Sequence, residues 1–379
     1  MLNRRSLRVK VMQSLFAFQQ CKEANYELSV DLVEHQFTPD LTSMEVQDKT
    51  ELKKLEKEAV KLFETTFVKD KSSVKHENDK IKSSVKEGLT FYAKSTKKDF
   101  DFFKKNLVLE AEKIYDLYIS VLGLFVTFAQ VAEGDKKIDH SNFYNNQWIK
   151  AFRGSEQLRS ELLKGKFQWD NRLGQVRAWL KDILRQDNEY MLYLDRKSPT
   201  VEDQKKIMNH LLRRVILGNT TISDAYEEDV LRWSEDREIV KGMVEKTIKA
   251  YDPESEAPLQ LHTLSMNWED DRDFIETLFS ASVNLDGKYR ELIAANTRNW
   301  EVERLPLTDR VILEMSIAEL ISFPNIPVKV TINEYIELSK NYSTPKSRQF
   351  INGILDVISK ELKNQGDLKK SGRGLIDNK

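Results

Sequence analysis

Apolar residues recur at helical spacing along most of this chain. In the first 20 residues they fall at Leu7, Val11, Leu15 and Phe18, with more apolar positions between them. Steps of three and four match the period of an α-helix, and a helix that is apolar over most of its circumference is usually central. We therefore expect a central helix over residues 1–20.

The same period predicts helices along the rest of the chain. A short second helix is expected over 28–37, an amphipathic helix from Glu51, a long helix or helical hairpin over 69–98, and helix again over 100–132. The later periodic segments are 142–163, 173–194, 201–217, 222–233, 235–251, 271–283, 287–296, 308–322, 331–341 and 345–362. No alternation typical of a β-strand is visible, so the sequence predicts an all-α fold.

A domain boundary is expected at residues 252–266. This stretch carries Pro253 and Pro258 and lacks a helical period. The tail, residues 363–379, is rich in Gly, Lys and Asn, and we expect it to be disordered.

Two segments raise the question of membranes and targeting. The most apolar stretch, Tyr115 to Ala132, is interrupted by polar residues and is short for a membrane span, which favours a buried core helix. The basic N-terminus shares features with a mitochondrial presequence, but it continues as one helix and lacks the apolar centre of a secretory signal. We expect a cytoplasmic protein that does not associate with membranes.

Charge and composition argue against several functional classes. The 61 acidic and 60 basic side chains nearly cancel, so any nucleic-acid site must be a local patch. Cys21 is the single cysteine, which excludes an intramolecular disulfide and the usual zinc frameworks. There is no glycine-rich phosphate loop and no catalytic histidine spacing. An acidic cluster at residues 269–273 could hold a cation, but such clusters more often open a helix. We therefore expect a binding protein with no enzymatic activity, no cofactor and no metal.

The two ends of the chain carry the strongest functional signals. Arg4, Arg5 and Arg8 lie in the first turns of the first helix, with no acidic residue before Glu23. Arginines in this arrangement suit contacts with phosphates, although terminal basic residues are often simply solvated.

Three segments in the C-terminal third resemble the NusB family of bacterial transcription antitermination factors. Residues 307–320 read LTDRVILEMSIAEL, residues 326–340 read IPVKVTINEYIELSK, and residues 347–356 read SRQFINGILD. The opening segment, RRSLRVKVMQSLF, is similar to the arginine-rich first helix of that family. The resemblance covers residues 1–20 and 270–362 and does not extend to residues 21 to about 265.

The resemblance implies a fold and a function. The fold would be an all-α, NusB-like helical bundle with an extended helical insertion: residues 1–20 as the first helix, 21–265 as the insertion, 266–362 as the C-terminal core and 363–379 as the tail. The function would be antitermination, by binding single-stranded boxA-type leader RNA of ribosomal RNA transcripts together with the ribosomal protein NusE, within the transcription elongation complex.

The resemblance also implies site residues. Arg4, Arg5 and Arg8 match RNA-contacting arginines, Lys329 and Phe350 match positions that line the RNA surface, and Asp309 matches an acidic position that faces NusE. Just before Ser347 the family often has an acidic residue, whereas this chain has Pro345 and Lys346.

Each of these residues also has a structural explanation. Phe350 shares a helical stripe with Ile354 and Ile358, which would place it in the core. Asp309 could cap a helix, and Lys329 could be a solvated loop residue. Gly353, inside a helical pattern, indicates close helix packing or close approach of a ligand.

Two other functions remain open. NusB-like domains also precede RNA methyltransferase domains, but such an enzyme needs a glycine-rich cofactor loop, which the sequence lacks. The chain could instead be a helical protein-interaction scaffold with a vestigial RNA surface.

Overall fold

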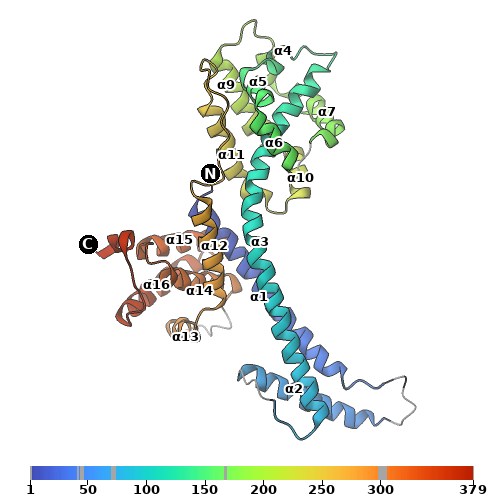
Figure 1. Ribbon diagram of the computed structural model, residues 1–379, viewed down its shortest axis with the longest axis vertical. Helices are drawn as coiled ribbons and strands as arrows, with labels where there is room; N and C mark the ends of the chain where they lie inside the picture. The colour runs from blue at the N-terminus through green and yellow to red at the C-terminus, as the bar shows by residue number, and fades with distance from the viewer. Residues whose placement is uncertain are drawn as a thin grey trace. The chain divides into compact units, whose positions relative to one another are not determined.

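The computed structural model describes residues 2–40, 42, 47–69, 74–165, 169–297 and 305–378 (Figure 1). Those residues form helices joined by turns and loops and contain no strand, which confirms the predicted all-α class. The chain divides into two compact units: unit 1 comprises Met1–Ser6 and Leu109–Asp271, and unit 2 comprises Leu7–Val108 and Arg272–Lys379. The expected insertion, residues 21–265, is therefore shared between both units.

Unit 2 contains the three C-terminal segments that resemble NusB. Its C-terminal bundle (Figure 1, orange to red) contains α12 (Trp268–Val283), α13 (Gly287–Asn296), α14 (Leu307–Ser322), α15 (Val328–Tyr342) and α16 (Ser347–Asn364). The expected bounds of these helices hold to within a few residues. All residues from 311 to 320 are buried, and α14 contacts α13, α15 and α16, so α14 is the central helix of this bundle.

Unit 2 also contains a helical arm built from α1 (Arg4–His35) from Leu7 onward, α2 (Lys49–Val68) and the first part of α3 (Asp79–Glu133), whereas Arg4 and Arg5 belong to unit 1. Its core includes Val33, Phe63 and Val85. Gly88 permits close packing here, because an added Cβ would lie 2.7 Å from Cγ2 of Val33.

The two helices expected over 1–20 and 28–37 are one continuous helix, α1. The polar stretch that separated them in the sequence pattern is helical as well. Its Asn25 is buried and donates a hydrogen bond of 2.7 Å to Asp99 of α3. A tertiary contact therefore satisfies the polar position that interrupts the apolar stripe.

Unit 1 surrounds the second part of α3 with short helices (Figure 1, green to yellow). They are α4 (Ser141–Tyr144), α5 (Gln147–Gly154), α6 (Glu156–Lys164), α7 (Leu173–Asp182), α8 (Asn188–Leu194), α9 (Val201–His210), α10 (Thr220–Asp229) and α11 (Trp233–Ala250), with 3-10 turns η1 (Trp169–Arg172) and η2 (Leu184–Gln186) and a π-helix η3 (Leu211–Ile216). The single helix expected over 142–163 is wrong, because Asn146 and Ser155 cap the starts of α5 and α6.

Helix α3 is long and apolar enough to cross a membrane by length and composition. However, 78% of its most apolar window is buried inside the protein. Polar groups on it are satisfied by neighbouring helices, as where Tyr118 lies 2.7 Å from the hydroxyl of Thr247. These contacts are typical of the core helix expected from the sequence.

The C-terminal tail packs against unit 2 as far as the structure describes it. It forms η5 (Gly372–Asn378), and Lys370 Nζ donates to the carbonyls of Leu320 and Phe323 at 2.9 and 3.0 Å. A lysine that binds the last carbonyls of α14 complements the negative end of that helix. This arrangement differs from the disordered tail expected from the sequence.

Candidate nucleic-acid interface

Arg8 is buried in unit 2, with 2% of its surface exposed. Its guanidinium forms a bidentate pair with Glu319 of α14, with Nε–Oε2 and Nη2–Oε1 distances of 2.7 Å. Burial lowers the pKa of Arg8, but the hydrogen bonds and charge of Glu319 raise it further, so the net pKa lies above its ordinary value. Arg8 is therefore a permanently charged member of the core, and in this structure its side chain is not presented to a ligand.

Two hydroxyls complete the shell around Glu319. Thr331 and Tyr335 of α15 donate to it at 2.9 Å each. Burial and the Glu319 charge raise the pKa of Tyr335, so its hydroxyl stays a donor. This network fixes α1 at Arg8 against α14 and α15. Sequence reasoning missed it, although a glutamate within the apolar run of α14 was a visible signal.

Arg4 and Arg5 are more accessible than Arg8. The side chain of Arg4 is 40% exposed, and its Nε lies 3.0 Å from Asp271. Arg5 is exposed. Asp271 belongs to the acidic cluster expected at residues 269–273, which opens α12. The cluster thus begins a helix and supplies an ion-pair partner for Arg4. Among the described residues, no three His, Cys, Asp or Glu side chains are grouped so that they could hold a metal ion.

Lys329 and Phe350 lie on adjacent helices of unit 2. Lys329 is exposed in the first turn of α15, so it is helical and not in a loop. Phe350 is half-buried, whereas Ile354 and Ile358 further along its stripe are buried. Part of the Phe350 ring thus remains accessible. Its exposure is intermediate between that of a core residue and that of a base-stacking residue, the two alternatives that the sequence left open.

Gly353 lies in the open on the surface of α16. A Cβ at this position would meet no atom within 4 Å. Close helix packing, one of the two explanations for this glycine, is therefore wrong for the described residues. Since Phe350 precedes it by three residues, both lie on the same side of α16.

Asp309 is turned into unit 2, with 3% of its surface exposed. Its two carboxylate oxygens accept hydrogen bonds from Ser343 at 2.5 Å and Ser347 at 2.7 Å. It makes no cap for α14. The carboxylate instead ties α14 to the end of α15 and the start of α16.

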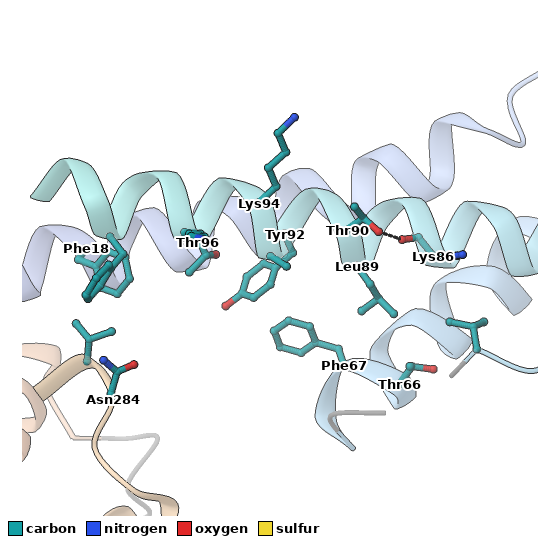
Figure 2. A pocket seen from close by; sticks show the side chains of 15 residues that line it. Phe18, Thr66, Phe67, Lys86, Leu89, Thr90, Tyr92, Lys94, Thr96 and Asn284 are labelled. Carbon is teal, nitrogen blue, oxygen red and sulfur yellow. Dashed lines mark hydrogen bonds between the residues drawn. The ribbon is translucent and has the colours of Figure 1, made fainter. Parts of the chain in front are cut away.

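Unit 2 also contains an apolar groove of about 1080 Å³ (Figure 2). Phe67 and Tyr92 lie in it with ring centroids 4.8 Å apart. Exposed lysines, Lys86, Lys94 and Lys97, stand at its rim. The groove therefore combines an apolar floor with a basic edge.

Fold and site thus define an all-helical protein in which Arg8 of the first helix is paired with a glutamate inside a C-terminal helical bundle. A family model described as the NusB family matches residues 237–360. The chain therefore contains a NusB-family domain, which includes most of α11, all of α12 to α15 and most of α16. The match begins within the segment expected to be an insertion, residues 21–265.

Curated relatives agree with this assignment. Transcription antitermination proteins NusB are 44% identical over 105 residues in Salinibacter ruber, 42% over 106 residues in Chloroherpeton thalassium and 40% over 89 residues in Natranaerobius thermophilus. These alignments cover 28%, 28% and 24% of this chain and 66%, 50% and 64% of the relatives. The chain thus spans between half and two thirds of the length of these relatives. No solved structure matches the chain.

Proposed function

We propose that this protein is a transcription antitermination factor that binds boxA-type leader RNA of ribosomal RNA transcripts together with ribosomal protein NusE. The NusB-family domain at residues 237–360 carries the proposal, because the named relatives are antitermination proteins. On this proposal the protein acts in the cytoplasm, on the transcription elongation complex, by binding and without catalysis.

The accessible residues have distinct roles in this proposal. Arg4 and Arg5 bind phosphates, and Lys329 binds a phosphate from the first turn of α15, where the helix dipole also favours an anion. Phe350 stacks on a base, and the open surface at Gly353 lets the RNA backbone approach α16.

The two buried residues act by positioning others. Arg8 holds the unit 2 part of α1 against α14 and α15. Asp309 sets the start of α16 through Ser347, and on this proposal it shapes the surface that NusE meets rather than touching NusE itself.

The experiment measures binding of leader RNA and scrambled RNA, each with and without NusE. Leader RNA should bind more tightly than scrambled RNA, and NusE should increase that preference. The double variant Arg4→Ala/Arg5→Ala should lose affinity, and the slope of log affinity against log salt should shrink by about 0.7 for each phosphate that the variant no longer binds. The matched control, Arg159→Ala/Arg177→Ala, removes two exposed arginines of unit 1 and should bind as wild type. Equal affinity for both RNAs would reject the proposal.

The apolar groove of Figure 2 favours a second function, that of a protein-interaction scaffold. Its apolar floor and lysine rim complement an acidic amphipathic helix of a partner protein. If Arg4→Ala/Arg5→Ala leaves RNA binding unchanged while Lys86→Glu/Lys94→Glu abolishes binding of an acidic amphipathic peptide, the scaffold function replaces the first.

A further inference from the structure

A basic groove of about 730 Å³ lies in unit 1, along α9, η3 and α11. The cationic or titratable side chains that line it are Lys205, Lys206, His210, Arg213, Arg214 and Lys249. Three carboxylates, Glu189, Glu202 and Glu245, also line it. Lysines and arginines therefore outnumber carboxylates, although the chain as a whole has a net charge of −1.

The groove is built around a π-helix. Helix α9 continues into η3, where the Leu217 amide donates to the Leu212 carbonyl at 3.0 Å, a five-residue step. The apolar residues of η3 are buried, whereas Arg213 and Arg214 are exposed. Short π-helical segments are rare and occur frequently at functional sites.

Gly218 makes this backbone turn possible. A Cβ at residue 218 would lie 2.5 Å from the Arg213 carbonyl oxygen and 2.9 Å from that of Arg214. The backbone at Gly218 therefore packs directly against the carbonyl groups of Arg213 and Arg214. This close approach fixes the backbone that presents both guanidinium groups.

The cations of the groove are only partly neutralised. Arg213 pairs with Glu245 at 2.6 Å, and His210 lies 2.9 Å from Asp187 and 3.1 Å from Glu189. Lys206 is 3.9 Å from Glu202, and both are well exposed. Among the described residues, Lys205, Arg214 and Lys249 have no carboxylate within 4.0 Å, so the groove holds a surplus of positive charge.

We propose that this groove binds the phosphodiester backbone of single-stranded RNA independently of sequence. The side chains that line the groove come from Lys, Arg, Glu, Asn and His210, with no Phe, Tyr or Trp for base stacking and no apolar side chain. The His210 imidazole is held beside Asp187 and Glu189, at 2.9 and 3.1 Å. An acidic peptide normally needs apolar anchors for affinity, whereas backbone binding needs only cations that track phosphates. The inference rests on the proposed function only in taking RNA as the ligand. Unit 1 would then bind the RNA that flanks the boxA-type element.

The test uses the full chain and a triple variant, Lys205→Ala/Arg214→Ala/Lys249→Ala. The matched control, Lys150→Ala/Arg177→Ala/Lys181→Ala, removes two exposed lysines and one exposed arginine of unit 1 from outside the groove. Probes are an oligouridylate, leader RNA, scrambled RNA and a polyglutamate peptide. Unfolding curves check that the variants fold, and the titrations are repeated at several salt concentrations.

For oligouridylate, the triple variant should bind more weakly than the control, and its salt slope should be smaller by about 2, from about 0.7 for each of three phosphates. The ratio of leader to scrambled affinity should stay at the wild-type value, because backbone contacts carry no sequence information. Unchanged oligouridylate binding overturns the inference. A loss confined to polyglutamate also overturns it, in favour of an acidic protein partner. If wild-type protein shows no preference for leader RNA, the proposed function fails, while the oligouridylate comparison still decides the groove.

Discussion

Arg8 and Glu319, 311 residues apart in the sequence, form a bidentate ion pair that is almost entirely buried. A buried charge is stable only when its hydrogen-bonding capacity is satisfied, and Thr331 and Tyr335 supply the remaining donors to Glu319. The pair therefore joins the opening of the chain to the family domain. It also explains why a basic residue of the first helix need not be a ligand contact.

Arg8→Ala should strongly destabilise unit 2, because it leaves Glu319 buried without its counter-charge. Removal of one member of a buried pair costs about 3–5 kcal/mol. The free energy of unfolding in urea measures the effect. Arg348→Ala, which removes an exposed arginine of α16, should change that free energy by less than about 0.5 kcal/mol. Equal stability of the two variants would contradict the structural role of Arg8.

Gly353→Ala should stabilise the fold and weaken RNA binding. Alanine in an exposed helical position is favoured over glycine by about 1 kcal/mol, and the new Cβ has open space around it. Its methyl group would occupy the surface that the RNA backbone is proposed to approach. Thermal unfolding and leader-RNA titration measure the two effects separately.

Gly242→Ala is the matched control for Gly353→Ala. Gly242 lies within α11, and a Cβ there also meets nothing within 4 Å. It should increase stability by a similar amount and leave RNA affinity unchanged. If Gly353→Ala gains stability and binds RNA as wild type, α16 does not approach the backbone at this residue.

The sequence predicted the helices around the family motifs well, because α15 and α16 have a clear helical period and α14 is a long apolar run that begins just after Pro306. The predicted helix ends were wrong where side-chain hydrogen bonds to the backbone begin a new helix. Nothing in a helical period shows that Asn146 and Ser155 will each accept a backbone hydrogen bond and break one helix into several. Likewise, Asn25 looked like an interruption, because its partner Asp99 lies 74 residues away.

The sequence named candidate site residues but gave no information about their surroundings in the fold. Motif matching found Arg8 and Asp309, but their burial depends on Glu319, Ser343 and Ser347, which only the folded bundle brings to them. The basic groove of unit 1 was missed because its cations come from α9, η3 and α11. A signal was nevertheless visible, because residues 204–223 contain Lys205, Lys206, Arg213 and Arg214 and no acidic residue.

Gly218→Ala should destabilise unit 1 and disturb the basic groove. The backbone must move, since the added Cβ would clash with the carbonyl oxygens of both groove arginines. Overpacking of this kind typically costs about 1–3 kcal/mol. Urea unfolding measures the loss, and Gly242→Ala again serves as the control, with a change of opposite sign. A neutral Gly218→Ala variant would show that the π-helical turn is not constrained by this contact.

Asp135 should make unit 1 sensitive to acid in a defined window. Burial alone raises its pKa, but hydrogen bonds from the Lys137 amide, His140 and Arg185 outweigh that effect and lower the pKa from 3.8 to about 2. The folded protein therefore binds fewer protons than the unfolded chain between these two values. The stabilisation from ionised Asp135 is fully present above about pH 4 and is lost as the pH falls towards 2.

Urea unfolding at pH 5 and at pH 2.5 should show this loss in the wild-type free energy of unfolding. Asp135→Asn should reduce the difference in that free energy between the two pH values. Asp182→Asn, which changes an exposed carboxylate of the same unit, should keep the wild-type difference. If Asp135→Asn also keeps the wild-type difference, Asp135 is not the source of the acid sensitivity.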